Sequence, residues 1–266
     1  MKQALKKYQL QLKQLQDTEK RDKYRIYGEL LQTYGYNVDP TTKSLECINY
    51  YTNEPVKIPL DPDLTPLENA QKYFDKYGKL KRTYEALHEL IQVTKSDIDH
   101  LDSILTAMDI ASNEADFAMI KEELIESGYI KRKGTAKKSA GKSKPYHYQT
   151  TDGYDIYVGK NNYQNDELTF KIAEGNDWWF HAKHMPGSHV IVRTKTGDLP
   201  DHVFDDAAAL AAYYSKGRGH DKVEIDYIQK KQIKKPNGSK PGFVVYYTNY
   251  SLAIAPSIQN VSLISE

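Results

Sequence analysis

One periodic series of apolar side chains constrains the fold of this 266-residue chain more than any other feature. Between residues 77 and 108, positions separated by alternating steps of three and four carry apolar or aromatic side chains, with one polar exception, Thr94. The series is Tyr77, Leu80, Tyr84, Leu87, Ile91, Thr94, Ile98, Leu101, Leu105 and Met108. A heptad pattern of this length is typical of a helix that packs lengthwise against another helix, as in a coiled coil.

The beginning of this helix is marked by the residues that precede the series. Thr65 is a good capping residue, Pro66 suits the first helical position, and Glu68 follows three residues after the cap. This order combines a capping box with a proline at the first position. We therefore expect the helix to begin near Pro66.

The first 34 residues repeat the spacing and predict a partner helix that ends near Gly35. Its apolar positions are Leu5, Tyr8, Leu12, Leu15, Ile26, Leu30 and Tyr34. Residues 45–60 lie between the two helices and are typical of a small β-hairpin. We therefore expect residues 1–128 to form an antiparallel coiled-coil hairpin with a β tip near 45–60. An arm of about 35 residues reaches roughly 50 Å, which suits contact with a distant partner.

The heptad series extends past the residues that the N-terminal helix can cover. Leu101, Leu105 and Met108 would lack a partner, which predicts that the chain is the C-terminal part of a longer protein. A shorter helix expected over 114–126 could cover them with Phe117, Ile120, Leu124 and Ile125. The alternative is a homodimer, a scaffold that pairs two copies through this unpaired seam.

A basic linker is expected over residues 129–145. Residues 131–145 contain seven basic side chains and no acidic one, so they cannot build a core. The segment is either a solvated flexible linker or a tether that also neutralises phosphates.

The apolar period changes to two from residue 146 onward, which predicts a compact β-rich domain over 146–266 and an α+β chain. Strands are expected at residues 154–158, 168–172, 178–181, 189–194, 223–228, 242–248 and 251–255. An alanine-rich helix is expected between them, over 204–215.

Aromatic and basic residues gather in this domain and predict a nucleic-acid interface. Aromatic planes beside cationic side chains suit base stacking with phosphate pairing. The predicted contact residues are Trp179, His181, Lys183, Ser188, His189, Arg193, Lys216, Arg218, Lys230, Lys231, Lys234 and Lys235. The alternative for the tryptophan is an ordinary place in the core.

The sequence gives little support to a metal site or a catalytic centre. His181, His184 and His189 alternate along a strand and no cysteine or carboxylate follows at ligand spacing, so we expect no metal or cofactor. Ser188 lacks the strand-turn-helix context of an activated nucleophile, and we expect no enzymatic activity. The single Cys47 fits a reducing cytoplasm and equally many surface proteins of bacteria, and the sequence shows neither a membrane span nor the apolar core of a signal peptide.

Two motifs resemble those of a known family. D-x-W-x-H-x-K-x-x-P-G-S-H-V at 177–190 and K-K-P-x-G-x-x-P-G at 234–242 are similar to the C-terminal NFACT-R domain of the NFACT proteins. The segment 54–74 is similar to the middle coiled coil of that family. The resemblance implies a signature made of Asp177, Trp179, His181, Lys183, Pro186, Gly187, Ser188 and His189.

The resemblance also implies a function. NFACT proteins take part in ribosome-associated quality control: they bind a large ribosomal subunit obstructed by peptidyl-tRNA and recruit alanyl-tRNA, so that an alanine tail is added to the stalled chain. Their coiled coil reaches the ribosomal stalk base. Bacterial members also carry an older label as fibronectin- or fibrinogen-binding adhesins, which leaves a surface adhesin, exported by a non-classical route, as the alternative.

Overall fold

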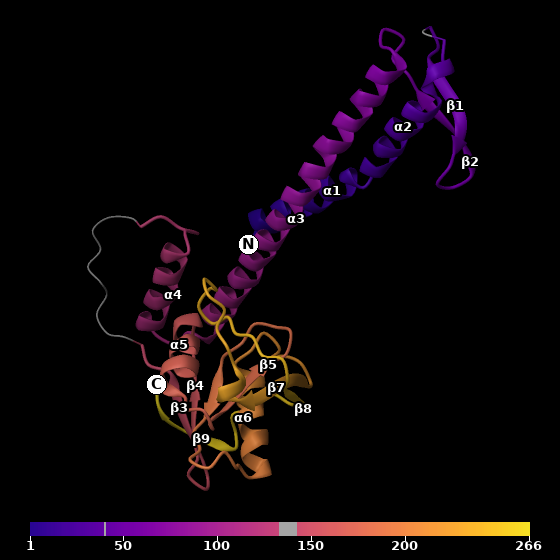
Figure 1. The fold of residues 1–266 in the computed structure, drawn as a ribbon. Coiled ribbons are helices and arrows are strands. Elements are labelled where there is room, and N and C mark those ends of the chain that lie inside the picture. Colours follow the sequence, from indigo (N-terminus) through magenta and orange to yellow (C-terminus); the bar gives the residue numbers. More distant parts are fainter. Residues whose placement is uncertain (40, 133–142) are drawn as a thin grey trace. The chain divides into compact units, whose positions relative to one another are not determined.

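In the computed structural model, residues 1–39, 41–132 and 143–266 are described. They fall into two units, Met1–Ile98 and Asp99–Glu266, and each unit is treated by itself. The chain is α+β, as predicted, with one long helix and a β-rich sheet domain (Figure 1). Most of the predicted basic linker, residues 133–142, lies outside the described residues.

The first unit contains helices and one β-hairpin. Its elements are α1 (Lys2–Thr18), α2 (Arg21–Tyr34), the 3-10 turn η1 (Gly35–Asn37), β1 (Ser44–Asn49), β2 (Glu54–Pro59) and the larger part of α3 (Pro66–Ile110). The predicted partner helix is thus two helices, with a break at Glu19 and Lys20. The hairpin is antiparallel, from Ser44 opposite Pro59 to Asn49 opposite Glu54, which confirms the predicted β segment.

The start of α3 is fixed by the capping box that the sequence predicts. The Glu68 backbone N–H donates to Thr65 Oγ1 over 3.2 Å, and the Thr65 backbone N–H donates to Glu68 Oε2 over 2.8 Å. These two bonds satisfy donors that the first turn of a helix otherwise leaves unpaired. The helix then continues for 45 residues.

The two helices α2 and α3 pack against each other in opposite directions. The ring of Tyr27 lies 5.3 Å from that of Tyr73, and the Arg21 guanidinium lies 4.0 Å from the ring of Tyr84, so earlier residues of α2 meet later residues of α3. A small core joins them to the hairpin through Tyr27, Leu30, Leu31, Ile58 and Ala70. Coiled-coil geometry along the whole of this helix pair stays a prediction.

The inner face of α1 differs from the one that the leucine spacing indicated. Gln11 and Thr18 are its buried residues, whereas Leu5 and Leu12 are 42% and 41% exposed. At Leu5 and Leu12 the inner stripe is shifted by one residue, to Ala4 and Gln11, whereas Tyr8 and Leu15 are half-buried on the predicted stripe. A seven-residue repeat of one residue type gives the period of a helix but not which of two adjacent stripes faces the neighbour.

A similar shift occurs at the end of α3. Ile104 and Ala107 are buried with Ile120 of α4 (Glu114–Glu126), while Leu105 and Met108 remain 45% and 43% exposed. The expectation that α4 covers the heptad seam is therefore wrong. The short helix packs against the stripe next to that seam.

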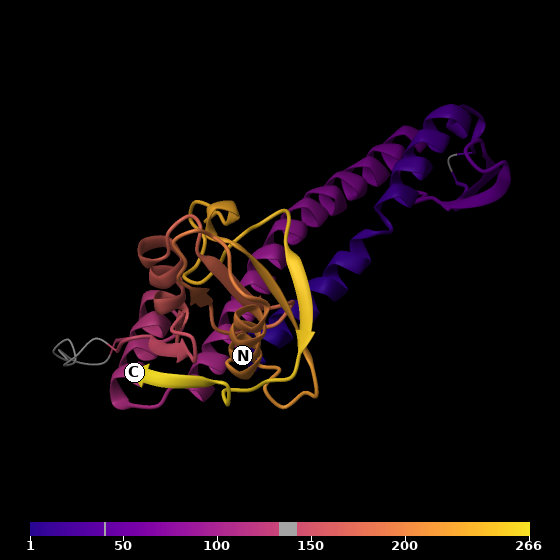
Figure 2. The same ribbon diagram turned by 90° about the horizontal axis from the view of Figure 1, so that it is seen from below.

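The second unit is built on a seven-stranded antiparallel sheet in the order β8-β7-β5-β6-β4-β3-β9. The edge strands β8 and β9 are the last two along the chain and have the yellow end of the colour scale in Figure 2. The strands are β3 (Tyr146–Thr150), β4 (Asp155–Val158), β5 (Trp178–Ala182), β6 (Val190–Val192), β7 (Val223–Gln229), β8 (Tyr250–Ile254) and β9 (Val261–Ser265).

Each face of the sheet has its own apolar layer. The helix α6 (Asp201–Tyr213) packs its alanines and Leu210 against one face, together with Phe180 and Ile225. The other face carries Trp179, Ile191 and Ile228. It is covered by η2 (Leu168–Ile172), which follows α5 (Asn162–Glu167), and by the segment that follows the 3-10 turn η3 (Lys230–Gln232).

Two of the predicted strands are wrong. Residues 168–172 form a π-helical turn, closed by the Ala173 N–H donating to the Leu168 carbonyl over 2.8 Å. Residues 242–248 form no strand, and their β-type pairing is one isolated bridge, between Val245 and Lys234. The five other predicted strands and the inserted helix are confirmed, with ends that differ by one to three residues.

Candidate nucleic-acid interface

The signature hairpin of β5 and β6 places its tryptophan inside the domain. Trp179 is fully buried, and its ring lies 5.5 Å from that of His181, 5.1 Å from that of His189 and 5.4 Å from that of Tyr246. These rings form one aromatic layer beneath the segment that follows η3. Trp179 therefore fills the core, as the alternative reading proposed, and its face is not open to a base.

The Pro-Gly-Ser-His turn between the two strands is held by buried hydrogen bonds. The Ser188 hydroxyl donates to the Gly159 carbonyl, and the Ser188 N–H donates to the Tyr214 carbonyl over 2.9 Å. The His189 N–H donates to Asn165 Oδ1 over 3.0 Å, and His189 Nδ1 lies 2.7 Å from Thr169 Oγ1. Because both side chains are buried and bonded to the fold, they anchor the turn instead of facing a ligand.

The two histidines of the signature carry no charge near neutral pH. Burial lowers the pKa of His181 to about 4 although the Asp226 carboxylate opposes this shift. Burial likewise holds the pKa of His189 well below its usual value, and the neighbouring His181 acts in the same direction. The expectation that these rings pair with phosphates is not supported, because a neutral ring offers no positive charge.

Four of the other predicted cations are engaged by carboxylates. Lys183 Nζ lies 3.8 Å from Glu224 and 3.9 Å from Asp226, and Lys216 Nζ lies 2.7 Å from Asp102. The remaining pairs are Arg193 with Glu174 and Asp177, and Lys235 with Asp166. Arg218 instead lies 3.8 Å from the ring centroid of Tyr213.

Three lysines remain available for a polyanion. Lys230, Lys231 and Lys234 form no salt bridge with any residue that the structure describes. Lys231 and Lys234 are exposed and Lys230 is half-buried. The Lys230 N–H donates to the Asp177 carbonyl and the Lys231 N–H to that of Gly175, so the turn η3 is fixed to the start of β5. We call Lys230, Lys231 and Lys234 the lysine triad.

Two aromatic residues beside the triad were missed in the sequence. Phe243 is 53% exposed and Tyr247 is 85% exposed, and both flank Val245, which pairs with Lys234. They belong to a segment predicted as a strand, where side chains alternate between core and solvent. This alternation could have identified the two exposed rings from the sequence, because Val244 and Tyr246, which lie between Phe243 and Tyr247 in the chain, pack inward.

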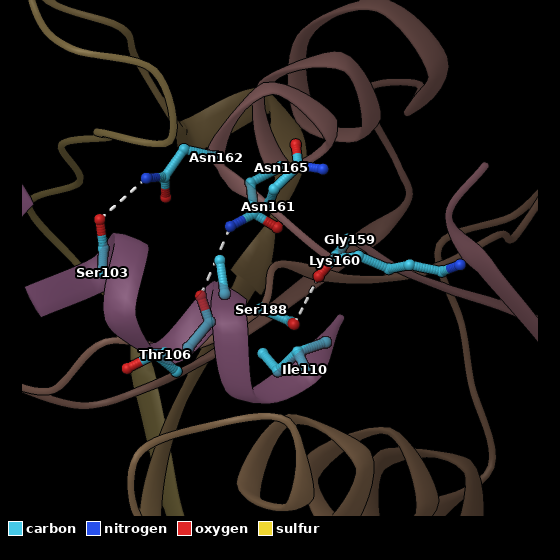
Figure 3. A pocket seen from close by; sticks show the side chains of 11 residues that line it. Ser103, Thr106, Ile110, Gly159, Lys160, Asn161, Asn162, Asn165 and Ser188 are labelled. Atoms are coloured by element: carbon cyan, nitrogen blue, oxygen red, sulfur yellow. Dashed lines mark hydrogen bonds between the residues drawn. The ribbon is translucent and has the colours of Figure 1, made fainter. Parts of the chain in front are cut away.

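A hollow near the signature is too small for a metabolite. Ser103, Thr106 and Ile110 of α3 line it together with Asn162 and Ser188 (Figure 3), and it holds about 10 Å³, roughly the space of one water molecule. The Asn162 side-chain amide donates to Ser103 Oγ across its edge over 2.8 Å. Small-molecule sites are typically about 300–1,000 Å³. The arrangement thus suits binding at a surface.

The described residues hold neither a metal-ligand cluster nor a membrane-spanning helix. No group of three or more His, Cys, Asp or Glu side chains there is placed to hold a metal ion. Within the same ranges, no helix has the length and apolar character to cross a membrane.

Comparisons with known proteins identify the family of this chain. Residues 1–143 match the family model described as the NFACT N-terminal and middle domains, and residues 144–247 match that of the NFACT protein RNA binding domain. The chain belongs to the NFACT family.

Several relatives cover nearly the whole chain. It is 47% identical over 253 residues to the "Rqc2 homolog RqcH" of Streptococcus suis and 38% identical over 256 residues to that of Bacillus subtilis. These matches cover 95% and 94% of the chain but 45% and 44% of the relatives, so the chain spans a little under half of their length. Mouse coiled-coil domain-containing protein 25 is 29% identical over 106 residues, 38% of this chain and 50% of its own.

A solved structure shares the fold. The C-terminal part of the fibronectin/fibrinogen-binding protein from Streptococcus suis superposes with a TM-score of 0.77 at 40% sequence identity. The match covers 97% of this chain and 90% of that one.

Proposed function

We propose that this chain is the ribosome- and tRNA-binding part of a quality-control factor that docks on obstructed large ribosomal subunits and supports alanine tailing of the stalled chain. The observation that carries the proposal is the lysine triad, a group of cations without acidic partners among the described residues, on the domain that matches the NFACT RNA binding domain. Such a group binds phosphates in a salt-dependent way. The similarity to RqcH supports the same reading.

The role is binding and not catalysis. The signature residues Trp179, Ser188 and His189 serve the core and the turn, and no side chain in that hairpin is both exposed and activated. The chain therefore contributes affinity and position, and it acts in the cytoplasm, where ribosomes are found. Chemistry on the stalled chain belongs to the ribosome that it engages.

The first unit supplies a second contact in this proposal. Tyr50 and Tyr51 at the hairpin turn are 47% and 54% exposed, and Ile48 is 48% exposed. The Tyr51 hydroxyl donates to Glu29 over 2.8 Å, which holds the turn against α2. An exposed apolar cluster on a fixed turn suits a protein surface, such as that of the ribosomal stalk base.

Charge reversal of the lysine triad tests the RNA contact. The variant Lys230→Glu/Lys231→Glu/Lys234→Glu should lower the affinity for large subunits about tenfold or more near 0.1 M salt, and it should flatten the dependence of affinity on salt. Co-sedimentation with purified large subunits at two salt concentrations measures both. Lys235 is left unchanged because it pairs with Asp166.

A control variant, Lys2→Glu/Lys6→Glu/Lys13→Glu, changes the net charge equally on the exposed face of α1. Co-sedimentation of the triad variant at the wild-type level would reject the triad as the RNA site. An equal loss in both variants would show that only the total charge matters.

A matrix-protein adhesin is the second candidate, because the solved structure with 40% identity is titled a fibronectin/fibrinogen-binding protein. Immobilised fibronectin and fibrinogen, assayed beside large subunits with the same protein, separate the two functions. Saturable matrix binding that survives in the triad variant, without any affinity for ribosomal subunits, would favour the adhesin.

A further inference from the structure

Two short segments after β7 form a ribbon that projects side chains away from the sheet. Residues 232–235 and 243–248 are joined by two backbone hydrogen bonds between Lys234 and Val245, each of 2.9 Å. Thr248 Oγ1 donates to Gln232 Oε1 over 3.3 Å and extends the pairing. We call these segments the aromatic ribbon.

The inner side of the aromatic ribbon is fixed to the core. Ile233 is buried, and Val244 and Tyr246 pack with it against the layer that contains Trp179. The Tyr246 hydroxyl also donates to Asp226 Oδ2 over 2.8 Å. These contacts determine which side chains of the ribbon face outward.

Gly242 fixes the point where the second segment emerges. Its φ of 77° lies in the left-handed region, and a Cβ atom there would lie 2.8 Å from Asn162 Oδ1. Its N–H donates to Asp166 Oδ1 over 2.9 Å, and the same carboxylate pairs with Lys235. The charge of Asp166 beside this point is thus already neutralised by Lys235.

The outer side of the ribbon presents aromatic rings next to a cation. Phe243 and Tyr247 are 53% and 85% exposed, and Lys234 lies opposite Val245, the middle residue between them. Neither ring packs into the core layers, and both sit on an anchored backbone. Rigid exposed rings beside cations are the two ingredients of a site that stacks bases and pairs phosphates.

We propose that the aromatic ribbon binds unpaired nucleotides of RNA, with Phe243 and Tyr247 stacking on bases while the lysine triad pairs with the backbone. This deepens the proposed function and rests on the RNA binding stated there. Unpaired nucleotides fit because their base faces are open, whereas a duplex hides these faces and offers mainly phosphates and sugars. The triad forms no salt bridge with a carboxylate of the described residues, so its positive charge is available for the phosphates of the RNA backbone.

Fluorescence anisotropy with two labelled RNA probes of equal length tests the proposal on the full chain. One probe is an unstructured single strand and the other a perfect duplex. Phe243→Ala/Tyr247→Ala should weaken single-strand binding about tenfold or more and leave duplex binding within about twofold, because stacking requires unpaired bases. Tyr247→Phe keeps the ring and should bind like the wild type. Tyr36→Ala, at a residue that is 80% exposed in the first unit, is the matched control.

The outcomes separate this proposal from the function on which it rests. Equal loss of both probes on removal of the rings, or no loss of either, overturns stacking, while loss of both probes in the triad variant would still uphold RNA binding. A wild-type protein that binds neither probe overturns stacking and RNA binding together. A wild-type protein that binds neither probe but whose capture by a ribosomal protein depends on the two rings assigns the ribbon to a protein contact instead.

Discussion

The two histidines of the signature, predicted to contact a ligand, instead affect the stability of the fold. His181 titrates near 4 in the folded protein, against an ordinary value of about 6.5 when the chain is unfolded. Between these two pKa values the unfolded chain binds a proton at His181, whereas the folded chain does not. The free energy of unfolding therefore falls as the pH is lowered from about 6.5 toward 4.

Replacement of this ring tests the assignment. His181→Phe keeps an aromatic ring beside Trp179 and removes the titrating group. We expect the wild type to lose about 2 kcal/mol more than the variant between pH 7 and pH 5, measured as the free energy of unfolding in urea. If the free energy of unfolding of His181→Phe depended on pH as that of the wild type does, His181 could not be the source of the dependence. The carboxylates and His189 are present in both proteins and would then account for it.

Sequence alone could not tell which of the predicted site residues are structural and which are available to a ligand. Trp179, Lys183 and Lys234 are all aromatic or cationic residues in a family motif, yet the first is core, the second lies near carboxylates and the third is open to solvent. Those carboxylates are Glu224 and Asp226 of β7, more than forty residues away in the chain. Pairing across strands decides which cation remains available, and it requires a register that single-sequence patterns do not give.

At the scale of elements, the sequence predicted best those features that depend on contacts between residues close together in the chain. The start of α3 followed from the capping box alone, and the hairpin of β1 and β2 from its alternation and turn. The π-helical turn η2 could not be predicted in this way. Its Leu168-Thr169-Phe170 order resembles a strand, but Leu168 and Thr169 are both buried, and Thr169 bonds to His189, twenty residues further along the chain.

The capping box provides a quantitative test of the long helix. Thr65→Ala removes the acceptor for the Glu68 N–H and should lower the free energy of unfolding by about 1 kcal/mol. Thr83→Ala is the matched control, because Thr83 is exposed in the middle of α3 and its hydroxyl only bonds the Lys79 carbonyl. It should be neutral or slightly stabilising, as alanine favours helix more than threonine. Far-UV circular dichroism during urea unfolding measures both, and equal destabilisation by the two changes would refute the cap.

At the scale of the molecule, composition conceals the distribution of charge. The formal net charge is +1, yet the lysine triad lies together on the turn η3 and the short segment after it, while other cations are engaged by carboxylates. The net charge of the whole chain therefore does not predict RNA binding, whereas the local excess of positive charge at the lysine triad does. The proposed division of function follows, with phosphate contacts in the second unit and a protein contact at the hairpin turn of the first.

This division predicts that the two contacts can be lost separately. Ile48→Ser/Tyr50→Ser removes exposed apolar surface at the hairpin turn while Ile58, which is fully buried in the core of that unit, stays in place. The variant should bind the single-stranded RNA probe as the wild type does but co-sediment with large subunits about tenfold less, since docking loses apolar contacts and RNA binding loses none. Leu90→Ser/Val93→Ser removes equally exposed apolar side chains from α3 and serves as the control. If the turn variant docked like the wild type, the lysine triad alone would account for ribosome binding. If it lost RNA binding as well, the two contacts would not be independent.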